Sequence, residues 1–184
     1  MAANLTGARV YTPNHETNAY GPIPMAGGQK WFPGSLVGWD TNASNSATTQ
    51  GYAVRYDQTA ANNGIVLIGR YRGQIIPTAN TFGGGVVGSF GATADNSGTS
   101  APTGNGALVV EVDFFKLLTF VWMDNVTGGH ACVQANVGSA VYAESDHEGG
   151  NTAGSLSKIG ILWALGTAAD NTVGQILVAT GTVN

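Results

Sequence analysis

The feature of this chain that most constrains its fold is a series of short apolar runs, which alternate with other residues and end at Gly, Pro or Asn. In "GYAVRYD" (51–57), Tyr52, Val54 and Tyr56 occupy every second position. Successive side chains of a β-strand point to opposite faces of the sheet, so this period of two predicts strands with one buried and one solvated face. The turn residues between the runs favour short connections between strands. The chain is therefore predicted to be all-β.

One of the predicted strands also fits a helix. The segment "VDFFKLLTFVWMDN" (112–125) places Phe115, Leu118 and Trp122 at helical spacing, but it is rich in aromatic and β-branched residues and starts without a capping box. We therefore expect a strand there, preceded by one helical turn around 114–117. The predicted strands are 29–32, 35–40, 51–57, 64–72, 107–113, 117–123, 130–135, 138–143, 158–165 and 172–180.

The alternation also predicts which side chains share a face. Two of the longer strands should each have one apolar side. These sides are formed by Ile65, Leu67 and Tyr71 in "GIVLIGRYRG" and by Ile159, Ile161 and Trp163 in "SLSKIGILWALG".

Composition narrows the functional class. Only 10% of the 184 residues are charged, the formal net charge is −4, and the seven Lys and Arg residues do not cluster. Nucleic-acid binding needs clustered cations that displace counterions from phosphates, so a nucleic-acid partner is not expected. The sequence has no apolar run of about 18 residues to cross a bilayer and no signal-peptide pattern at its start. Because Cys132 also stands alone, we expect synthesis in a reducing cytoplasm, with no membrane partner and no internal disulfide.

A change in composition and apolar patterning near residue 29 divides the chain into an arm and a domain. Residues 1–28 are polar and offer only "ARVY" (8–11) as a short strand, so they are predicted to form an extended N-terminal arm that packs on another surface. Residues 29–184 are predicted to form a single β domain with a Gly/Thr/Ser-rich loop insertion at about 77–106. A loop of that length in a compact domain is usually functional or in contact with a partner.

Residue types that carry catalysis are sparse. Glu111 and Asp113 alternate on one strand and could form a glycosidase pair, but two acids on the solvated face of a strand are far more common. No serine lies in a Gly-x-Ser-x-Gly elbow. His130, Cys132 and His147 could meet across a hairpin as zinc ligands, yet their spacing matches no established zinc pattern. We therefore expect no catalytic residues, no metal and no cofactor.

The tryptophans pose the main functional question. In "KWFPGSLVGWD" (30–40), the Pro-Gly pair fits a type II turn, and the second tryptophan extends an apolar row along one face of the following strand. The alternative is a platform for stacking sugar rings, with exposed rows such as Tyr52 and Tyr56. We expect the core or a contact between subunits to be anchored by Trp31, Trp39, Trp122 and Trp163.

Several segments follow one another in a characteristic order: "PGSLVGWDTN", "GYAV", "IVLIGRYRGQI", "GALVVEVDFFKLL", "VGSAVYAES" and "SKIGILWALG…VGQILV". In this order they resemble the head decoration, or structural cement, proteins of tailed phages. The insertion at 77–106 is absent from the short members of that family. The matching positions are 34–40, 51–54, 68–70, 108–112 with Phe114 or Phe115, 137–142 and 159–160.

The resemblance implies a small β-barrel or β-tulip-like domain with an extended N-terminal arm and long loop insertions. It further implies a virion protein on the outer surface of the capsid, made in the host cytoplasm. Its partner would be the major capsid protein, and it would form homotrimers around local three-fold positions. The arm would add a strand to an exposed edge of the shell. The candidate capsid-binding residues of the arm are Leu5, Arg9, Val10 and Tyr11.

Two other classes of function stay open at this point. The chain could be another phage structural protein, of the tail or the minor capsid, because the β-barrels of such proteins have similar composition. It could also be a surface carbohydrate-binding β-module that uses its exposed aromatic residues.

Overall fold

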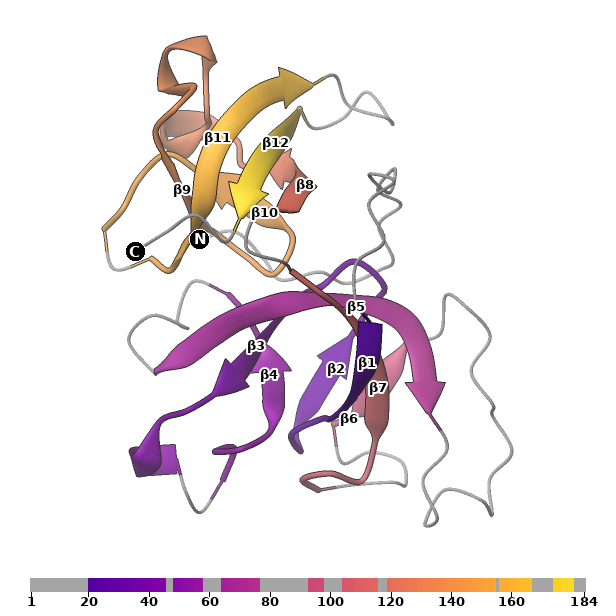
Figure 1. Cartoon of the computed structure of the whole chain (residues 1–184). Coiled ribbons are helices and arrows are strands. Elements are labelled where there is room, and N and C mark those ends of the chain that lie inside the picture. Colours follow the sequence, from indigo (N-terminus) through magenta and orange to yellow (C-terminus); the bar gives the residue numbers. More distant parts are fainter. Residues whose placement is uncertain are drawn as a thin grey trace.

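The computed structural model is all-β, as the sequence predicts, and its strands form two lobes (Figure 1). The first, the sheet lobe, is built from residues 20–115 and lies below in the figure. The second, the barrel lobe, is built from residues 119–180 and contains a closed five-stranded barrel. The structure describes residues 20–45, 48–57, 64–76, 93–97, 104–115, 119–154, 156–166 and 174–180.

The sheet lobe contains a five-stranded antiparallel sheet and a two-stranded ribbon. In spatial order the sheet consists of β1 (Tyr20–Pro24), β7 (Val109–Phe114), β5 (Ile65–Ile76), β3 (Leu36–Asp40) and β4 (Ala53–Arg55). The ribbon pairs β2 (Gln29–Trp31) with β6 (Ala94–Asn96), and a short 3-10 turn, η1 (Ala43–Asn45), follows β3.

The barrel lobe closes through one parallel pair, between β8 and β10, while its other neighbouring strands are antiparallel. Closure removes free edges, which would otherwise pair with other chains. In spatial order the strands are β10 (Glu148–Gly150), β8 (Thr119–Asn125), β12 (Gln175–Thr180), β11 (Lys158–Gly166) and β9 (Ala140–Ala143). Two short 3-10 turns, η3 (Gly128–His130) and η4 (Gln134–Asn136), lie between β8 and β9.

The predicted strand at 130–135 is wrong, because side chains satisfy the backbone there in place of a neighbouring strand. The Asn125 side chain both accepts from the Cys132 N–H and donates to the Cys132 carbonyl, at 2.8 and 2.9 Å. The Asn136 side chain accepts from the Val133 N–H at 2.8 Å. Asn side chains that bond the nearby backbone compete with a strand ladder in this way. The segment forms η3, η4 and a short connection instead.

The predicted arm extends too far along the chain. All five residues of β1 pair with β7, and Ile23 and Met25 are buried in the sheet lobe. Residues 20–28 are therefore part of the folded lobe, because a partner strand and an apolar core are available to them. Leu5, Arg9, Val10 and Tyr11, the predicted capsid-binding residues, lie outside the described residues. Within the predicted insertion at 77–106, residues 94–96 form β6, and most of the remainder lies outside the described residues.

Each lobe is stabilised by its own cluster of buried hydrophobic side chains. The first belongs to the sheet lobe and consists of Ile23, Met25, Trp31, Val37, Ala53, Tyr71, Ala94, Leu108, Val110 and Val112. The second fills the barrel with Val121, Met123, Cys132, Val141, Ala143, Ile159, Leu162, Ile176 and Val178, and it also takes in Leu36 and Tyr56 from the sheet lobe. The barrel core is thus completed by side chains of the other lobe.

Hydrogen bonds also connect the lobes. The Leu36 N–H donates to the Asp146 carbonyl at 2.7 Å, and the Tyr56 hydroxyl donates to the Lys158 carbonyl at 3.0 Å. Arg70 on β5 donates to the carbonyl of Trp122 on β8. Because apolar and polar contacts both cross the boundary, we expect the lobes to unfold as one cooperative unit.

Candidate binding surface on the barrel

Trp31 and Trp39 belong to the core of the sheet lobe. Trp31 is fully buried, and its ring meets the ring of Tyr71 edge-on, with the centroids 6.0 Å apart. Trp39 on β3 is partly buried against the same cluster. Both side chains therefore stabilise the fold by removing large apolar surfaces from water.

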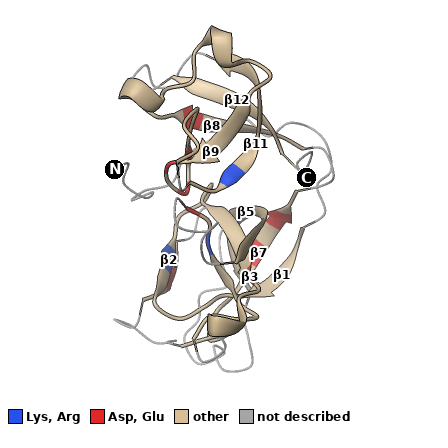
Figure 2. Cartoon of the chain, turned by 90° about the vertical axis from the view of Figure 1, so that its left-hand side faces the viewer, with Lys and Arg blue, Asp and Glu red and all other residues tan. Residues whose placement is uncertain are grey.

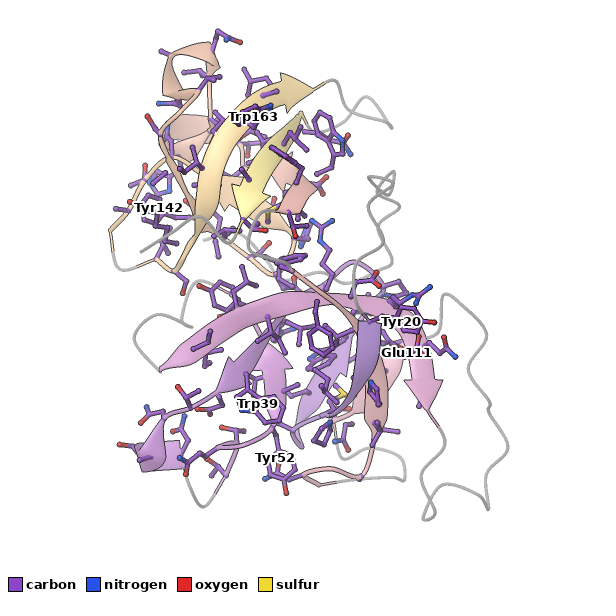
Figure 3. The ribbon with its side chains drawn as sticks, viewed as in Figure 1. Tyr20, Trp39, Tyr52, Glu111, Tyr142 and Trp163 are labelled. Carbon is purple, nitrogen blue, oxygen red and sulfur yellow. The ribbon has the colours of Figure 1, made fainter. Side chains whose placement is uncertain are left out.

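Trp163 stands on the outside of the barrel and is 59% exposed (Figure 3). The alternation predicts it on one side with Ile159 and Ile161. Ile161 does lie on the same side as Trp163, but Ile159 is buried in the barrel core, so the prediction is wrong for Ile159. The pairing of β11 shifts register twice, between Lys158 and Gly160 and again around Trp163. A β-bulge of this kind adds a residue to one strand and redirects the side chains beyond it. The first shift separates Ile159, which faces the core, from Ile161 and Trp163, which lie on either side of the buried Leu162 and point outward by ordinary alternation.

Trp163 is part of a larger apolar surface. Its ring lies edge-on to that of Phe120 on β8, with the centroids 5.2 Å apart. Trp122 on β8 is paired with Leu177 on β12, and residues paired in this way share a face of the sheet. We call this surface the barrel face, formed on three neighbouring strands by Phe120, Trp122, Ile161, Trp163 and Leu177, all partly or largely exposed.

One further exposed apolar side chain lies near the barrel face. Val137 is 41% exposed. The residue after Val137 donates its N–H to the carbonyl of Leu162, which holds this segment against β11 beside Trp163. The apolar surface therefore continues beyond the face itself. Isolated exposed apolar residues are ordinary, but a contiguous apolar patch marks a binding surface.

The residues of the barrel face are all uncharged. Charged residues are few in the described part of the barrel lobe (Figure 2). Three of the acidic residues in the described part of the barrel lobe, Asp124, Glu144 and Asp146, are buried. Glu148 is partly buried, and Lys158, which is exposed, lies at the start of β11 next to the sheet lobe. An outward surface of this kind suits a partner that is apolar and uncharged where it makes contact.

A second group of side chains has catalytic residue types but lacks access to solvent. The Ser145 hydroxyl lies 3.1 Å from Nδ1 of His147, and Nε2 of His147 lies 3.9 Å from Oδ2 of Asp124. Ser145 is fully buried, and His147 and Asp124 are 5% and 6% exposed. A substrate would have to reach a hydroxyl that the fold covers. The cluster instead fixes the loop whose Asp146 carbonyl accepts the bond from the sheet lobe.

The histidines and cysteine considered as zinc ligands have other roles. His130 Nδ1 lies 2.8 Å from Oε1 of Glu144. Burial, with a smaller contribution from Glu144, raises the pKa of Cys132 to about 11, so its thiol stays protonated at neutral pH. A protonated thiol is a poor nucleophile. Across the described ranges, no group of three or more His, Cys, Asp or Glu side chains could hold a metal ion.

The two acids on β7 form ion pairs with one arginine. Arg72 on β5 lies 3.6 Å from Glu111 and 3.5 Å from Asp113, and its guanidinium stacks on the ring of Tyr20, 4.4 Å from the centroid. Burial raises the pKa of Asp113, while Arg72 acts in the opposite direction. The cluster binds β1, β5 and β7 together on one side of the sheet lobe.

A polar pocket of about 250 Å³ lies elsewhere in the sheet lobe. Its wall includes the buried carboxylate of Asp40, which accepts hydrogen bonds from Thr49, Asn45 and the Asn42 N–H. Burial alone would raise the pKa of Asp40, but these hydrogen bonds outweigh it and the net pKa is lowered. The remaining lining residues are Gln29, Val54, Arg55, Asp57 and Ile65. The carboxylate is satisfied by the protein itself, so it organises the loop after β3.

The sugar platform imagined from Tyr52 and Tyr56 is not formed. Tyr56 is 5% exposed and contributes to the barrel core. Tyr52 is only partly exposed. An aromatic platform of this kind requires both rings at the surface.

Comparisons with known proteins assign no family to the chain, so its function is inferred from the geometry of the structure. No protein-family model, curated protein or solved structure matches the chain. Within the described residues there is no helix long and apolar enough to span a bilayer.

Sequence reasoning singled out Trp122 and Trp163 but missed their neighbours Phe120 and Leu177 on the barrel face. A signal was present in the sequence: "FVWM" (120–123) and "ILVA" (176–179) are apolar at consecutive positions. Such strands have apolar side chains on both faces, and one face of a small barrel must point outward.

Proposed function

We propose that this chain is a bacteriophage capsid decoration (cement) protein, which binds the outer surface of the assembled head and stabilises it by bridging major capsid protein subunits. The observation that carries the proposal is the barrel face, an uncharged aromatic surface on the outside of a closed barrel. The order of sequence segments described above supports the same assignment. The chain acts as a binding protein without catalysis, metal or cofactor.

Retention on the shell comes from many weak contacts acting together. Each copy attaches through its N-terminal arm, where "ARVY" adds a strand to an exposed edge of the capsid protein. Copies assembled as homotrimers at local three-fold positions bind several capsid subunits at once, which converts modest contacts into strong net retention. Bridged neighbours then separate less readily under internal pressure.

Co-sedimentation with capsids tests the proposal. The purified chain is mixed with shells assembled from a tailed-phage major capsid protein, and bound protein is measured after pelleting. We expect saturable binding and a higher temperature of shell disruption. A variant lacking residues 2–19 leaves β1 intact and should stay folded but bind with strongly reduced occupancy. Full occupancy by this variant would refute the role of the arm, and absence of wild-type binding would refute the function.

The exposed ring pair of Trp163 and Phe120 favours a second candidate, a surface carbohydrate-binding module. Aromatic rings at a surface stack on sugar rings, and the polar, weakly charged composition suits that role. A glycan array separates the two candidates: saturable glycan binding that is lost in Trp163→Ser supports the module. A third candidate, another tail or minor capsid protein, is separated by locating the chain within the particle.

A further inference from the structure

The polar pocket of the sheet lobe contains hydrogen-bonding groups that the fold leaves open. Its volume is about 250 Å³, and its wall comes from β2, β3, η1, β4 and β5 together with the loops after η1 and β4. Pockets for drug-sized ligands measure about 300–1,000 Å³, so a slightly smaller pocket suits a ligand of one ring. We propose that this pocket binds a single neutral sugar ring through its hydroxyl groups. The inference goes beyond the proposed function, because it concerns a site outside both the arm and the barrel face.

The pocket wall supplies hydrogen-bond donors. The Nε–H of Arg55 is buried and has no hydrogen-bond acceptor, although Oδ2 of Asp57 lies 3.7 Å away as its ion-pair partner. Such a buried donor is rare in a folded protein and calls for an acceptor from outside the chain. Gln29 adds a second donor, because its Oε1 accepts from the Arg55 N–H at 3.3 Å and its amide nitrogen donates to no described residue.

The buried carboxylate of Asp40 supplies an acceptor that is already held in place. It accepts from the Asn42 N–H at 2.9 Å and from the Asn45 side chain at 2.8 Å. The Thr49 hydroxyl donates a third bond at 2.5 Å. A carboxylate has about four positions for accepted bonds, so one position remains for a ligand. Because the three bonds fix the group before a ligand arrives, little ordering is needed on binding.

The combination of groups selects the chemistry of the ligand. Ionised carboxylates only accept hydrogen bonds and a guanidinium only donates them, and Asp40, Asp57 and Arg55 line the same pocket. Neighbouring hydroxyls of a sugar ring do both. An ammonium group only donates and is repelled by Arg55, whereas a phosphate only accepts and is repelled by the two carboxylates. Val54 and Ile65 add an apolar part of the wall, which suits the C–H groups of a ring.

Solution NMR on the isotope-labelled full chain tests the proposal. Glucose, galactose, mannose and N-acetylglucosamine are added one at a time up to about 50 mM, a range that covers a dissociation constant of about 1 mM. We expect saturable shifts of the amide signals of Gln29, Asn45 and Arg55 with at least one of these sugars. Glucosamine, which is cationic, and a glucose phosphate, which is anionic, should give no saturable shift of these signals.

Arg55→Lys keeps the positive charge but removes the Nε–H donor. The dissociation constant of the sugar should rise about tenfold, as expected for loss of a hydrogen bond to a charged group. Arg72→Lys is the matched control, because the side chains of Arg72 and Arg55 are 25% and 30% exposed and Arg72 pairs with acids on β7, outside the pocket. This variant should bind like the wild type. Circular dichroism establishes that both variants are folded.

Gln29→Glu is a second pocket variant if Arg55→Lys does not fold. It keeps the oxygen that accepts from the Arg55 N–H and removes the amide donor. Its affinity for the sugar should also fall.

The outcomes separate this site from the other candidates. Absence of saturable shifts with every neutral sugar overturns the proposal, and so does an Arg55→Lys variant that binds like the wild type. Equal binding of glucosamine or of the glucose phosphate contradicts a neutral ligand. Sugar binding that is lost in Trp163→Ser and kept in Arg55→Lys overturns the pocket and assigns the sugar to the barrel face. Sugar binding at the pocket without any capsid binding supports this inference and refutes only the decoration function.

Discussion

The two lobes differ in where their charged side chains lie. In the sheet lobe, charged side chains lie at the surface in pairs, with Lys30 3.1 Å from Asp95 and Arg72 within 3.6 Å of both Glu111 and Asp113. In the described barrel lobe, most acids are buried and the outer face is aromatic. The sheet lobe therefore presents paired charges to water, whereas the barrel lobe presents an uncharged apolar face, the kind of surface that our proposal assigns to binding.

Replacing the buried tryptophan of the sheet lobe should have the largest effect on stability. Trp31→Ala should lower the free energy of unfolding by about 3–5 kcal/mol, because it leaves a cavity beside Tyr71 in the sheet core. Urea unfolding followed by circular dichroism measures the change. A loss below about 1 kcal/mol would mean that Trp31 does not anchor the core.

The next largest effect is expected from replacing the buried carboxylate of Asp40 in the sheet lobe. Asp40→Asn should cost about 1–3 kcal/mol at pH 7, because the new amide meets donors from Thr49 and Asn45. The folded pKa of Asp40 is lowered, so its contribution is present above the unfolded value of 3.8 and is lost as the pH falls below it. The difference between variant and wild type should shrink from pH 5 to pH 3. A difference independent of pH would contradict this origin.

Tyr56→Phe examines the boundary between the lobes. It removes the hydroxyl that donates to the Lys158 carbonyl but keeps the ring in the barrel core, so it should cost about 1 kcal/mol. Both lobes should still unfold in one transition. Tryptophan fluorescence and circular dichroism recorded on the same urea series would show two separate midpoints if the lobes were independent.

The smallest effect on stability is expected on the barrel face. Trp163→Ser should change the free energy of unfolding by less than about 1 kcal/mol, because the side chain is 59% exposed. The same urea measurement applies. A loss as large as that of Trp31→Ala would mean that Trp163 serves the fold, and the contrast between the lobes would fail.

Much of the strand content followed from the sequence because period-two alternation acts locally. The strands predicted at 35–40, 64–72 and 158–165 overlap β3, β5 and β11. The short strands β6 and β10 were missed, since each lies in a segment rich in Gly, Asn and acidic residues that is typical of a turn or loop. β1 was missed because its two prolines are typical of an arm, although the partner strand β7 accommodates them at a sheet edge.

The candidate surface was predictable only in part. Trp122 and Trp163 stood out by residue type, but no local pattern distinguishes a core tryptophan from an exposed one. The assignment depended on the register shift that separates Ile159 from Ile161 and Trp163, and on the register that sets Trp122 beside Leu177. Both are properties of paired strands far apart in sequence.

By itself, the sequence determined an all-β chain with few charges, because alternation and composition act residue by residue. The tertiary structure decided that the chain forms two lobes, that Leu36 and Tyr56 complete the core of the barrel, and that an aromatic face points outward. Those features depend on which strands become neighbours, and strand neighbours are selected by the burial and backbone pairing of the whole fold.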